Sequence, residues 1–155
     1  MEPLIQRVPG FCVVGVSTFG DAASGLFPRA WDMFMKLEKN VEWKETDKAF
    51  GIEFYTEEFH KEGKWFYMAC KEVANLTSIP EVMVGKRIPE NQYAVFTCEG
   101  LSNLKNTFQF AYREWLPGSN YVSAGCYDFE LYDDRFKGAD NPESVIDIYI
   151  PVKKK

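Results

Sequence analysis

The sequence predicts an α+β protein in which a β-α-β-β unit occurs twice. One observation is a repeated motif: IEFYTEEF at 52–59 returns as FELYDDRF at 129–136, with a glutamate, a tyrosine and a phenylalanine at matching places. A second is that strand, helix, strand and strand patterns follow one another in the same order around both copies. We therefore expect one curved antiparallel sheet with two helices on one face and a ligand cleft between the halves.

The first copy spans about 10–75. Its strands are expected at 11–19, 51–59 and 64–73, with a turn at 61–63 between the last two. A helix is expected over 26–39, because apolar side chains recur there at spacings of three and four. The residues of this apolar stripe are Phe27, Ala30, Phe34 and Leu37.

The second copy spans about 90–153, and both copies together form one domain over 1–155. Its strands are expected at 93–100, 121–136 and 145–152. Its helix carries an apolar stripe that ends before Pro117 and Gly118. The residues of this stripe are Leu101, Leu104, Phe108, Ala111 and Trp115.

Strand alternation sorts the side chains between the two faces of the sheet. In the last strand we assign Ile146, Ile148 and Ile150 to the face that the helices cover, and in the strand before it Phe129 and Leu131. The matching strand of the first copy is expected to place Phe66, Met68 and Cys70 on that face. Glu130 then lies on the uncovered face, together with Tyr149, Trp65 and Tyr67. Rings around one carboxylate on a bare sheet face indicate a binding groove.

Composition excludes several classes of function. The formal net charge of -5 argues against a nucleic-acid-binding domain, which usually has a basic face. The four cysteines form no C-x-x-C pair and His60 is the one histidine, so we expect reduced thiols, no metal site, no cofactor and no Ser-His-Asp triad. No signal segment precedes the first strand and no stretch is long and apolar enough for a membrane helix, which predicts a cytoplasmic protein. Aromatic residues make up 16% of the chain, a share that favours a ring-lined ligand site.

Structural explanations compete with a binding role at each of these residues. A glutamate on an exposed strand is ordinarily solvated, and Glu53 is equally well explained as a relic of the duplication. Trp115 and Trp31 fit the core or its rim as well as a ligand site. Tyr112 stands one position away from the apolar stripe of its helix, so its orientation is open.

Several segments resemble the GyrI-like effector-binding domain, which occurs alone and at the C-terminus of AraC- and MerR-type multidrug-responsive regulators. These segments are IPEVMVGKRIPENQYAVFTCEG, REWLPGSNY, DFELYD and IDIYIPVKK, and GIEFYTEEF with GKWFYMACKEV resembles the stand-alone, integron-associated branch. The resemblance implies the duplicated fold with its cleft. It also implies that Glu130 is the acidic pocket residue for cationic lipophilic compounds and that Tyr149 is an aromatic pocket wall. The chain has no room before Phe11 for a helix-turn-helix, so no direct nucleic-acid binding is expected.

Three hypotheses for the function follow. The first is a cytoplasmic small-molecule binding protein for planar aromatic or cationic lipophilic xenobiotics. The second, implied by stand-alone relatives, is a hydrolase of cyclopropanoid DNA-alkylating compounds, in which Glu130 and Tyr149 would be the catalytic residues of an aromatic cage. The third is an interaction protein that inhibits DNA gyrase. The candidate ligand-binding residues are Glu130, Tyr149, Trp65, Tyr67, Trp115, Tyr112 and Glu53.

Overall fold

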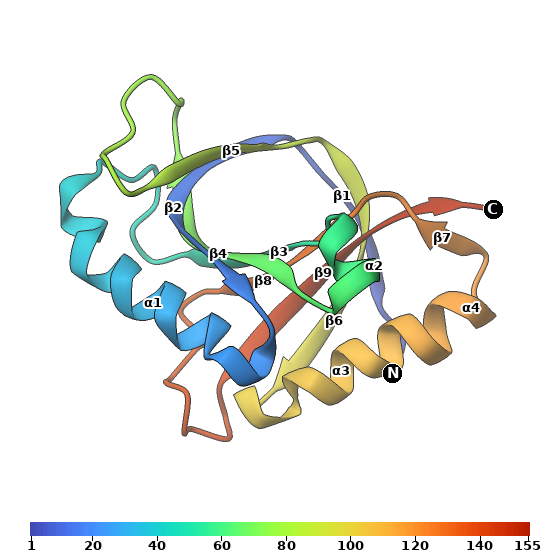
Figure 1. The fold of residues 1–155 in the computed structure, drawn as a ribbon. Coiled ribbons are helices and arrows are strands. Elements are labelled where there is room, and N and C mark those ends of the chain that lie inside the picture. The colour runs from blue at the N-terminus through green and yellow to red at the C-terminus, as the bar shows by residue number, and fades with distance from the viewer. The chain divides into compact units, whose positions relative to one another are not determined.

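The strand-helix-strand-strand order appears twice in the computed structural model, which describes all residues from Met1 to Lys155 (Figure 1). The chain divides into two compact units. The central unit consists of Gly10–Pro89, and the terminal unit consists of Met1–Pro9 with Glu90–Lys155. Each unit is an antiparallel sheet with its own helices, so the expected α+β class is confirmed.

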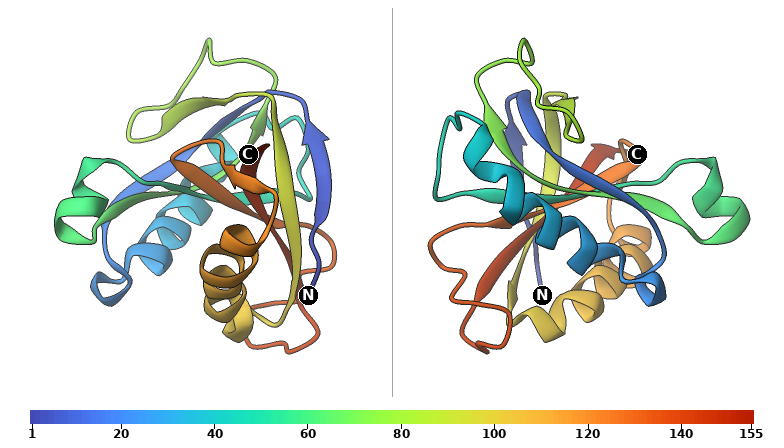
Figure 2. Two further views of the ribbon diagram at one scale, coloured as in Figure 1. Left: turned by 90° about the vertical axis from the view of Figure 1, so that its right-hand side faces the viewer. Right: turned by 60° about the vertical axis from the view of Figure 1, so that its left-hand side comes forward.

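The central unit has a four-stranded sheet in the order β5-β2-β4-β3. Its strands are β2 (Phe11–Gly20), β3 (Ala49–Phe54), β4 (Trp65–Val73) and β5 (Val84–Ile88). Its helices are α1 (Leu26–Leu37), α2 (Glu57–Glu62) and the short 3-10 turns η1 (Ala22–Ser24) and η2 (Glu38–Asn40). Leu26, Ala30 and Phe34 of α1 are buried at a spacing of four, and α1 lies across β2 and β4 (Figure 2).

The terminal unit repeats this arrangement in the order β1-β6-β9-β8, and β7 also pairs with β9. Its strands are β1 (Leu4–Val8), β6 (Asn91–Glu99), β7 (Tyr121–Ser123), β8 (Tyr127–Tyr132) and β9 (Val145–Lys154). Its helical segment runs through η3 (Leu101–Asn103), α3 (Leu104–Phe110), the π-helical turn η4 (Ala111–Trp115) and α4 (Leu116–Gly118). In the central unit β4 lies between β2 and β3, and in the terminal unit β9 lies between β6 and β8. The matching order confirms the duplication.

Both units also contain structure that the sequence analysis missed. The segment expected to continue the strand through 51–59 turns into helix α2. Two acidic residues in its first turn, two basic ones in its last turn and Gly63 in a left-handed conformation after it are all typical of a short helix. Strands β1 and β5 were not expected either. Strand β1 pairs with β6, and β5 pairs with β2.

No helix of the protein has both the length and the apolar character needed to cross a bilayer.

Candidate functional site

The strand register of the terminal unit places Glu130 on the face that the helices cover. Glu130 lies opposite Ile148 in the β8–β9 pair, while Phe129 lies opposite Tyr149. Residues directly opposite each other in an antiparallel pair project to the same side of the sheet. Ile148 packs in one core cluster with Phe96 and the helical residue Ala111. The expectation that Glu130 stands on the uncovered face is therefore wrong.

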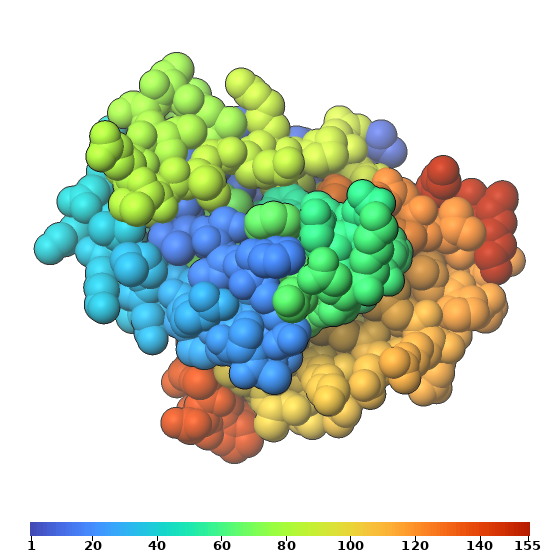
Figure 3. Space-filling model, in the orientation of Figure 1, coloured from blue at the N-terminus to red at the C-terminus, as the bar shows by residue number.

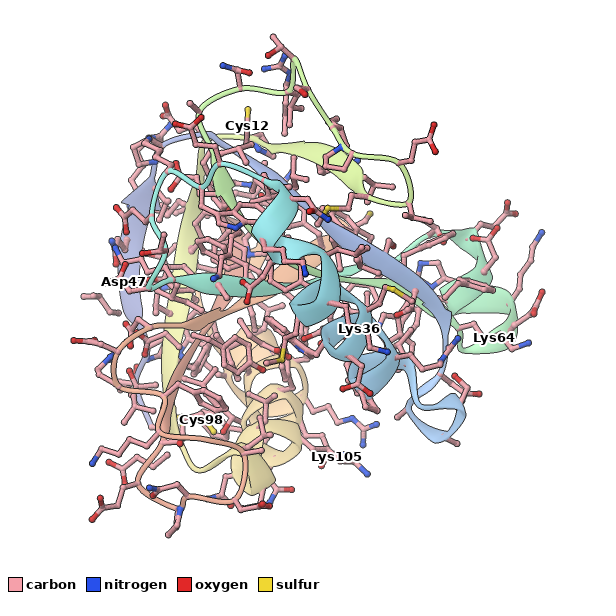
Figure 4. The ribbon with its side chains drawn as sticks, turned by 90° about the vertical axis from the view of Figure 1, so that its left-hand side faces the viewer. Cys12, Lys36, Asp47, Lys64, Cys98 and Lys105 are labelled. Carbon is pink, nitrogen blue, oxygen red and sulfur yellow. The ribbon has the colours of Figure 1, made fainter.

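A neighbouring thiol lies on the same face as Glu130, because Cys98 is opposite Ile146 in the β6–β9 pair. Burial raises the pKa of Cys98, and the negative charge of Glu130 raises it further. Cys98 belongs to the helix-covered core of the terminal unit. Figure 4 shows Cys98 beside α3, with Lys105 of the same helix pointing away from the sheet. Glu130 is thus close to a side chain that lies beneath the helix.

The same reversal holds in the central unit. Tyr67 and Ala69 of β4, and not Phe66, Met68 and Cys70, pack in the core cluster beneath α1. Glu53 lies opposite Tyr67 in the register, so it too shares the helix-covered face.

The physical reason for both errors is that the two faces of each sheet are buried. Met68 and Phe129 are 1% and 2% exposed although neither is on the helix side. Alternation of apolar and polar residues distinguishes a core face from a solvated one only where one face is solvated. On β8 the more polar line of side chains is the one that the helices cover, whereas on β9 Ile148 and Ile150 lie on the helix side as expected.

Glu130 is the buried acceptor of a tyrosine hydroxyl. Its side chain is 2% exposed, and the hydroxyl of Tyr132 donates to Oε2 at 2.6 Å. Asp128, two residues earlier on the same face of β8, is 0% exposed and accepts a hydrogen bond at 2.6 Å from the hydroxyl of Tyr112. Two buried carboxylates on one strand face thus each accept a hydrogen bond from a phenol.

The π-helical turn brings Tyr112 to Asp128. The backbone N–H of Leu116 donates to the carbonyl of Ala111, five residues earlier, which widens this turn. Tyr112 packs in the core cluster with Trp115 and most of the stripe, although it stands one position off the stripe in sequence. Asp128 was missed as a site residue. The signal available in the sequence was that Asp128 and Glu130 are two residues apart and so share one face of the strand.

The central unit repeats the tyrosine-to-glutamate pair. Glu53 is 6% exposed and accepts a hydrogen bond at 3.1 Å from the hydroxyl of Tyr55, again two residues on. Tyr67 is 1% exposed, and its hydroxyl accepts a hydrogen bond at 2.9 Å from the indole N–H of Trp31. Tyr55 lies near Phe59 and Trp65, with ring centroids 4.8 and 6.5 Å apart, respectively.

Tyr149 lies in different surroundings from Glu130, whereas Trp115 is on the helix-covered side of the sheet, as Glu130 is. The ring of Tyr149 stacks on Phe129 at 4.6 Å, on the face that the helices do not cover. Burial raises the pKa of Tyr149, with Asp147 as the next cause, so its phenol is neutral at neutral pH. Trp115 packs edge-on against Phe96 in the core, as the structural explanation of this residue expects. The structure therefore places Glu130 and Tyr149 on opposite faces of the sheet.

The buried phenol of Tyr93 leads to a prediction about alkaline stability. Burial raises the pKa of Tyr93 far above its ordinary value of about 10, helped by the hydroxyl of Tyr127 at 2.7 Å. Above pH 10 the unfolded chain releases this proton and the folded chain keeps it, so the free energy of unfolding falls as the pH rises, by up to about 1.4 kcal/mol per pH unit. Tyr93→Phe should remove this contribution to the pH dependence of the unfolding free energy. Near pH 7.5 it should lower the unfolding free energy by about 0.5–1.5 kcal/mol, because a hydrogen bond is lost.

Urea unfolding at pH 7.5, 9.5 and 11 measures this effect. The curves of the wild type and Tyr93→Phe should converge as the pH rises. Parallel curves across the whole range would show that Tyr93 ionises equally in the folded and unfolded chains.

Comparison with known proteins shows the family to which this α+β fold belongs. The family described as "Integron-associated effector binding protein" (Cass2) matches residues 4–152. The chain belongs to this family, and the expected resemblance to GyrI-like effector-binding proteins is confirmed.

One characterised relative is the transcriptional regulator BrlR of Pseudomonas aeruginosa, which is 32% identical over 154 residues. The match covers 98% of this chain and 56% of the regulator, so the chain spans little more than half of its relative's length. The expectation that this protein does not contact nucleic acid stays a prediction.

Two solved structures share the fold. SAV2435 bound to tetraphenylphosphonium has a TM-score of 0.76 at 18% identity, covering 99% of this chain and 94% of SAV2435. The integron cassette protein Cass2 of Vibrio cholerae has a TM-score of 0.65 at 21% identity, covering 98% and 96% of the two chains. At these identities the likeness is one of fold.

Proposed function

We propose that the protein is a cytoplasmic binding protein for cationic lipophilic or planar aromatic xenobiotics, and that Glu130 is the acidic group of its ligand site. The observation that carries this proposal is the burial of Glu130 to 2% exposure on a helix-covered, ring-rich face. Membership in an effector-binding family supports it. So does the lipophilic cation bound to SAV2435, a protein of the same fold.

A buried carboxylate favours a lipophilic cation for electrostatic reasons. Opposite charges 4 Å apart attract by about 4 kcal/mol at an effective dielectric constant of about 20, but by only about 1 kcal/mol in water. A cation whose charge is covered by phenyl groups loses little hydration on entering such a site, whereas an ammonium ion loses much. Aromatic faces add about 0.5–2 kcal/mol each when a cation lies over them.

The phenol of Tyr132 supports the same role. A hydroxyl that donates to Oε2 fixes the orientation of the carboxylate and leaves its negative charge in place. The same pair at Glu53 and Tyr55 shows that this arrangement belongs to the repeated unit. We therefore infer that each tyrosine orients the carboxylate of its own unit.

Binding of two probes of equal shape and opposite charge tests the proposal. We expect tetraphenylphosphonium to quench the tryptophan fluorescence with saturation and tetraphenylborate to have a much smaller effect. Tetraphenylphosphonium recovered from the mixture should be unchanged in mass. Equal affinity for both ions, or no saturable binding of the cation, would contradict the proposal.

The same assay distinguishes the hydrolase hypothesis. In this assay a cyclopropane-bearing electrophile replaces the phosphonium ion. Recovery of a product heavier by one water, in molar excess over the protein, would identify an enzyme. In that case the pair on one sheet face is Glu130 with Tyr132, because Tyr149 lies on the other face.

A further inference from the structure

The indole N–H of Trp65 is a buried hydrogen-bond donor without an acceptor. Its Nε1 atom is shielded from solvent and makes no hydrogen bond. Two other tryptophans of the central unit are satisfied: Trp31 donates to the hydroxyl of Tyr67 and Trp43 to the carbonyl of Glu38, each at 2.9 Å. Buried donors in folded proteins are nearly always paired, so the exception at Trp65 needs an explanation.

The surroundings of Trp65 explain why no protein acceptor is present. Three rings surround the indole: Phe59 at 6.0 Å, Phe27 at 6.2 Å and Tyr55 at 6.5 Å between centroids. Phenylalanine rings carry no hydrogen-bonding atom, and the hydroxyl of Tyr55 donates to Glu53. The partly buried indole thus lies beside apolar ring surface on which an aromatic ligand can pack.

The cluster also has an exposed side. Phe59 is 38% exposed and belongs to α2, a helix of six residues that has no buried residue. The green atoms of α2 lie at the surface of the protein in Figure 3. A ligand can therefore approach the rings of Tyr55, Phe59 and Trp65 from solvent at the cost of displacing an exposed ring.

We propose that the indole N–H of Trp65 recognises a hydrogen-bond acceptor on a ligand that packs on this cluster of the central unit, an inference that rests on the proposed function for the class of ligand. The preferred ligands are then aromatic cations that also carry a carbonyl, ether or ring-nitrogen acceptor. The rings of Tyr55 and Phe59 hold the aromatic part, Glu53 adds negative charge nearby, and the indole N–H selects the acceptor. A site that is built to donate a hydrogen bond discriminates strongly against analogues that lack the acceptor, because its buried donor then stays unpaired.

Two phosphonium ions of nearly equal size test this inference. The (4-acetylphenyl)triphenylphosphonium ion carries a carbonyl where the (4-ethylphenyl)triphenylphosphonium ion carries a methylene group, and both keep their positive charge at neutral pH. We expect the wild type to bind the carbonyl-bearing ion about tenfold more tightly, which corresponds to about 1.4 kcal/mol. In Trp65→Phe the ratio of the two affinities should fall to near one. Trp43→Phe, which removes an indole of the same unit whose N–H already donates to the carbonyl of Glu38, should keep the wild-type ratio.

The wild-type protein alone provides a second measurement, in case Trp65→Phe folds poorly. The four tryptophans give four indole N–H signals in a nitrogen–proton correlation spectrum. The signal of Trp65 should move downfield with the carbonyl-bearing ion and much less with its analogue. A ratio near one in the wild type, or an unchanged ratio in Trp65→Phe, would overturn the role of Trp65 while both ions still bind. If neither ion binds, the proposed function fails as well.

Discussion

Replacing Glu130 with glutamine should lower the affinity for tetraphenylphosphonium at least tenfold, or by about 1.4 kcal/mol or more. Glutamine keeps the shape of the side chain and an oxygen that can accept the hydrogen bond from Tyr132. The substitution therefore removes the charge and retains the packing. Affinity for triphenylphosphine oxide, a neutral molecule of similar shape, should change less than twofold. Isothermal titration calorimetry measures both affinities.

A surface carboxylate of the same unit provides the matched control. Glu143 is exposed and forms an ion pair with Lys137. Glu143→Gln changes the net charge of the protein by the same amount, so any long-range electrostatic effect should appear in both variants. If Glu130→Gln weakens the cation and the neutral molecule equally, the loss is one of packing, and Glu130 does not recognise charge.

Truncating Phe96 to alanine should cost about 3–5 kcal/mol of unfolding free energy, the largest effect on stability that we expect from a single side chain here. Phe96 is 0% exposed in the helix-covered core of the terminal unit, and it packs edge-on against Trp115 and Phe110. Its removal leaves a cavity between β6 and the helical segment. The truncated protein loses the transfer free energy of the ring, and the atoms that line the cavity lose their contacts with it.

Phe66 provides a comparison on the face that the sequence analysis wrongly took as core. It is 38% exposed and has a tilted ring contact with Phe19 at 4.8 Å. Phe66→Ala should cost less, about 1–2 kcal/mol, because 38% of this side chain is already exposed in the folded protein. Urea unfolding followed by circular dichroism compares the two variants. Similar losses for Phe96→Ala and Phe66→Ala would contradict the difference in burial between these two side chains.

The parts of the fold that the sequence predicted are those with a strong periodic signal. The apolar stripe of α1 and the stripe through α3 and η4 both mark true helices, because one side of each helix is buried and the other is solvated. The duplication was visible because the glutamate and tyrosine of each copy have a shared structural role, the hydrogen bond between them. Short elements such as α2 and β5 were missed because a strand or helix of about six residues has too few side chains to show a period.

The candidate site was predicted in its residue types but not in its geometry. Glu130, Glu53 and Tyr67 are buried on helix-covered faces, so the carboxylates lie where the sequence analysis expected only apolar side chains. Which face a helix covers depends on how the chain crosses from strand to helix, and alternation alone does not specify this when both faces are buried. The partnership of Tyr112 with Asp128 depends on the π-helical turn, which has no simple sequence pattern.

Carbon NMR of the glutamate side chains tests most directly whether Glu130 recognises the cation. Protein labelled at the glutamate carboxyl carbons is titrated with tetraphenylphosphonium, and signals are assigned from Glu130→Gln and Glu143→Gln. We predict a large saturable shift of the Glu130 carboxyl signal at the concentration that saturates fluorescence quenching, with the Glu143 signal unmoved. A Glu130 signal that stays in place while the cation saturates its site would show that the ligand is held elsewhere.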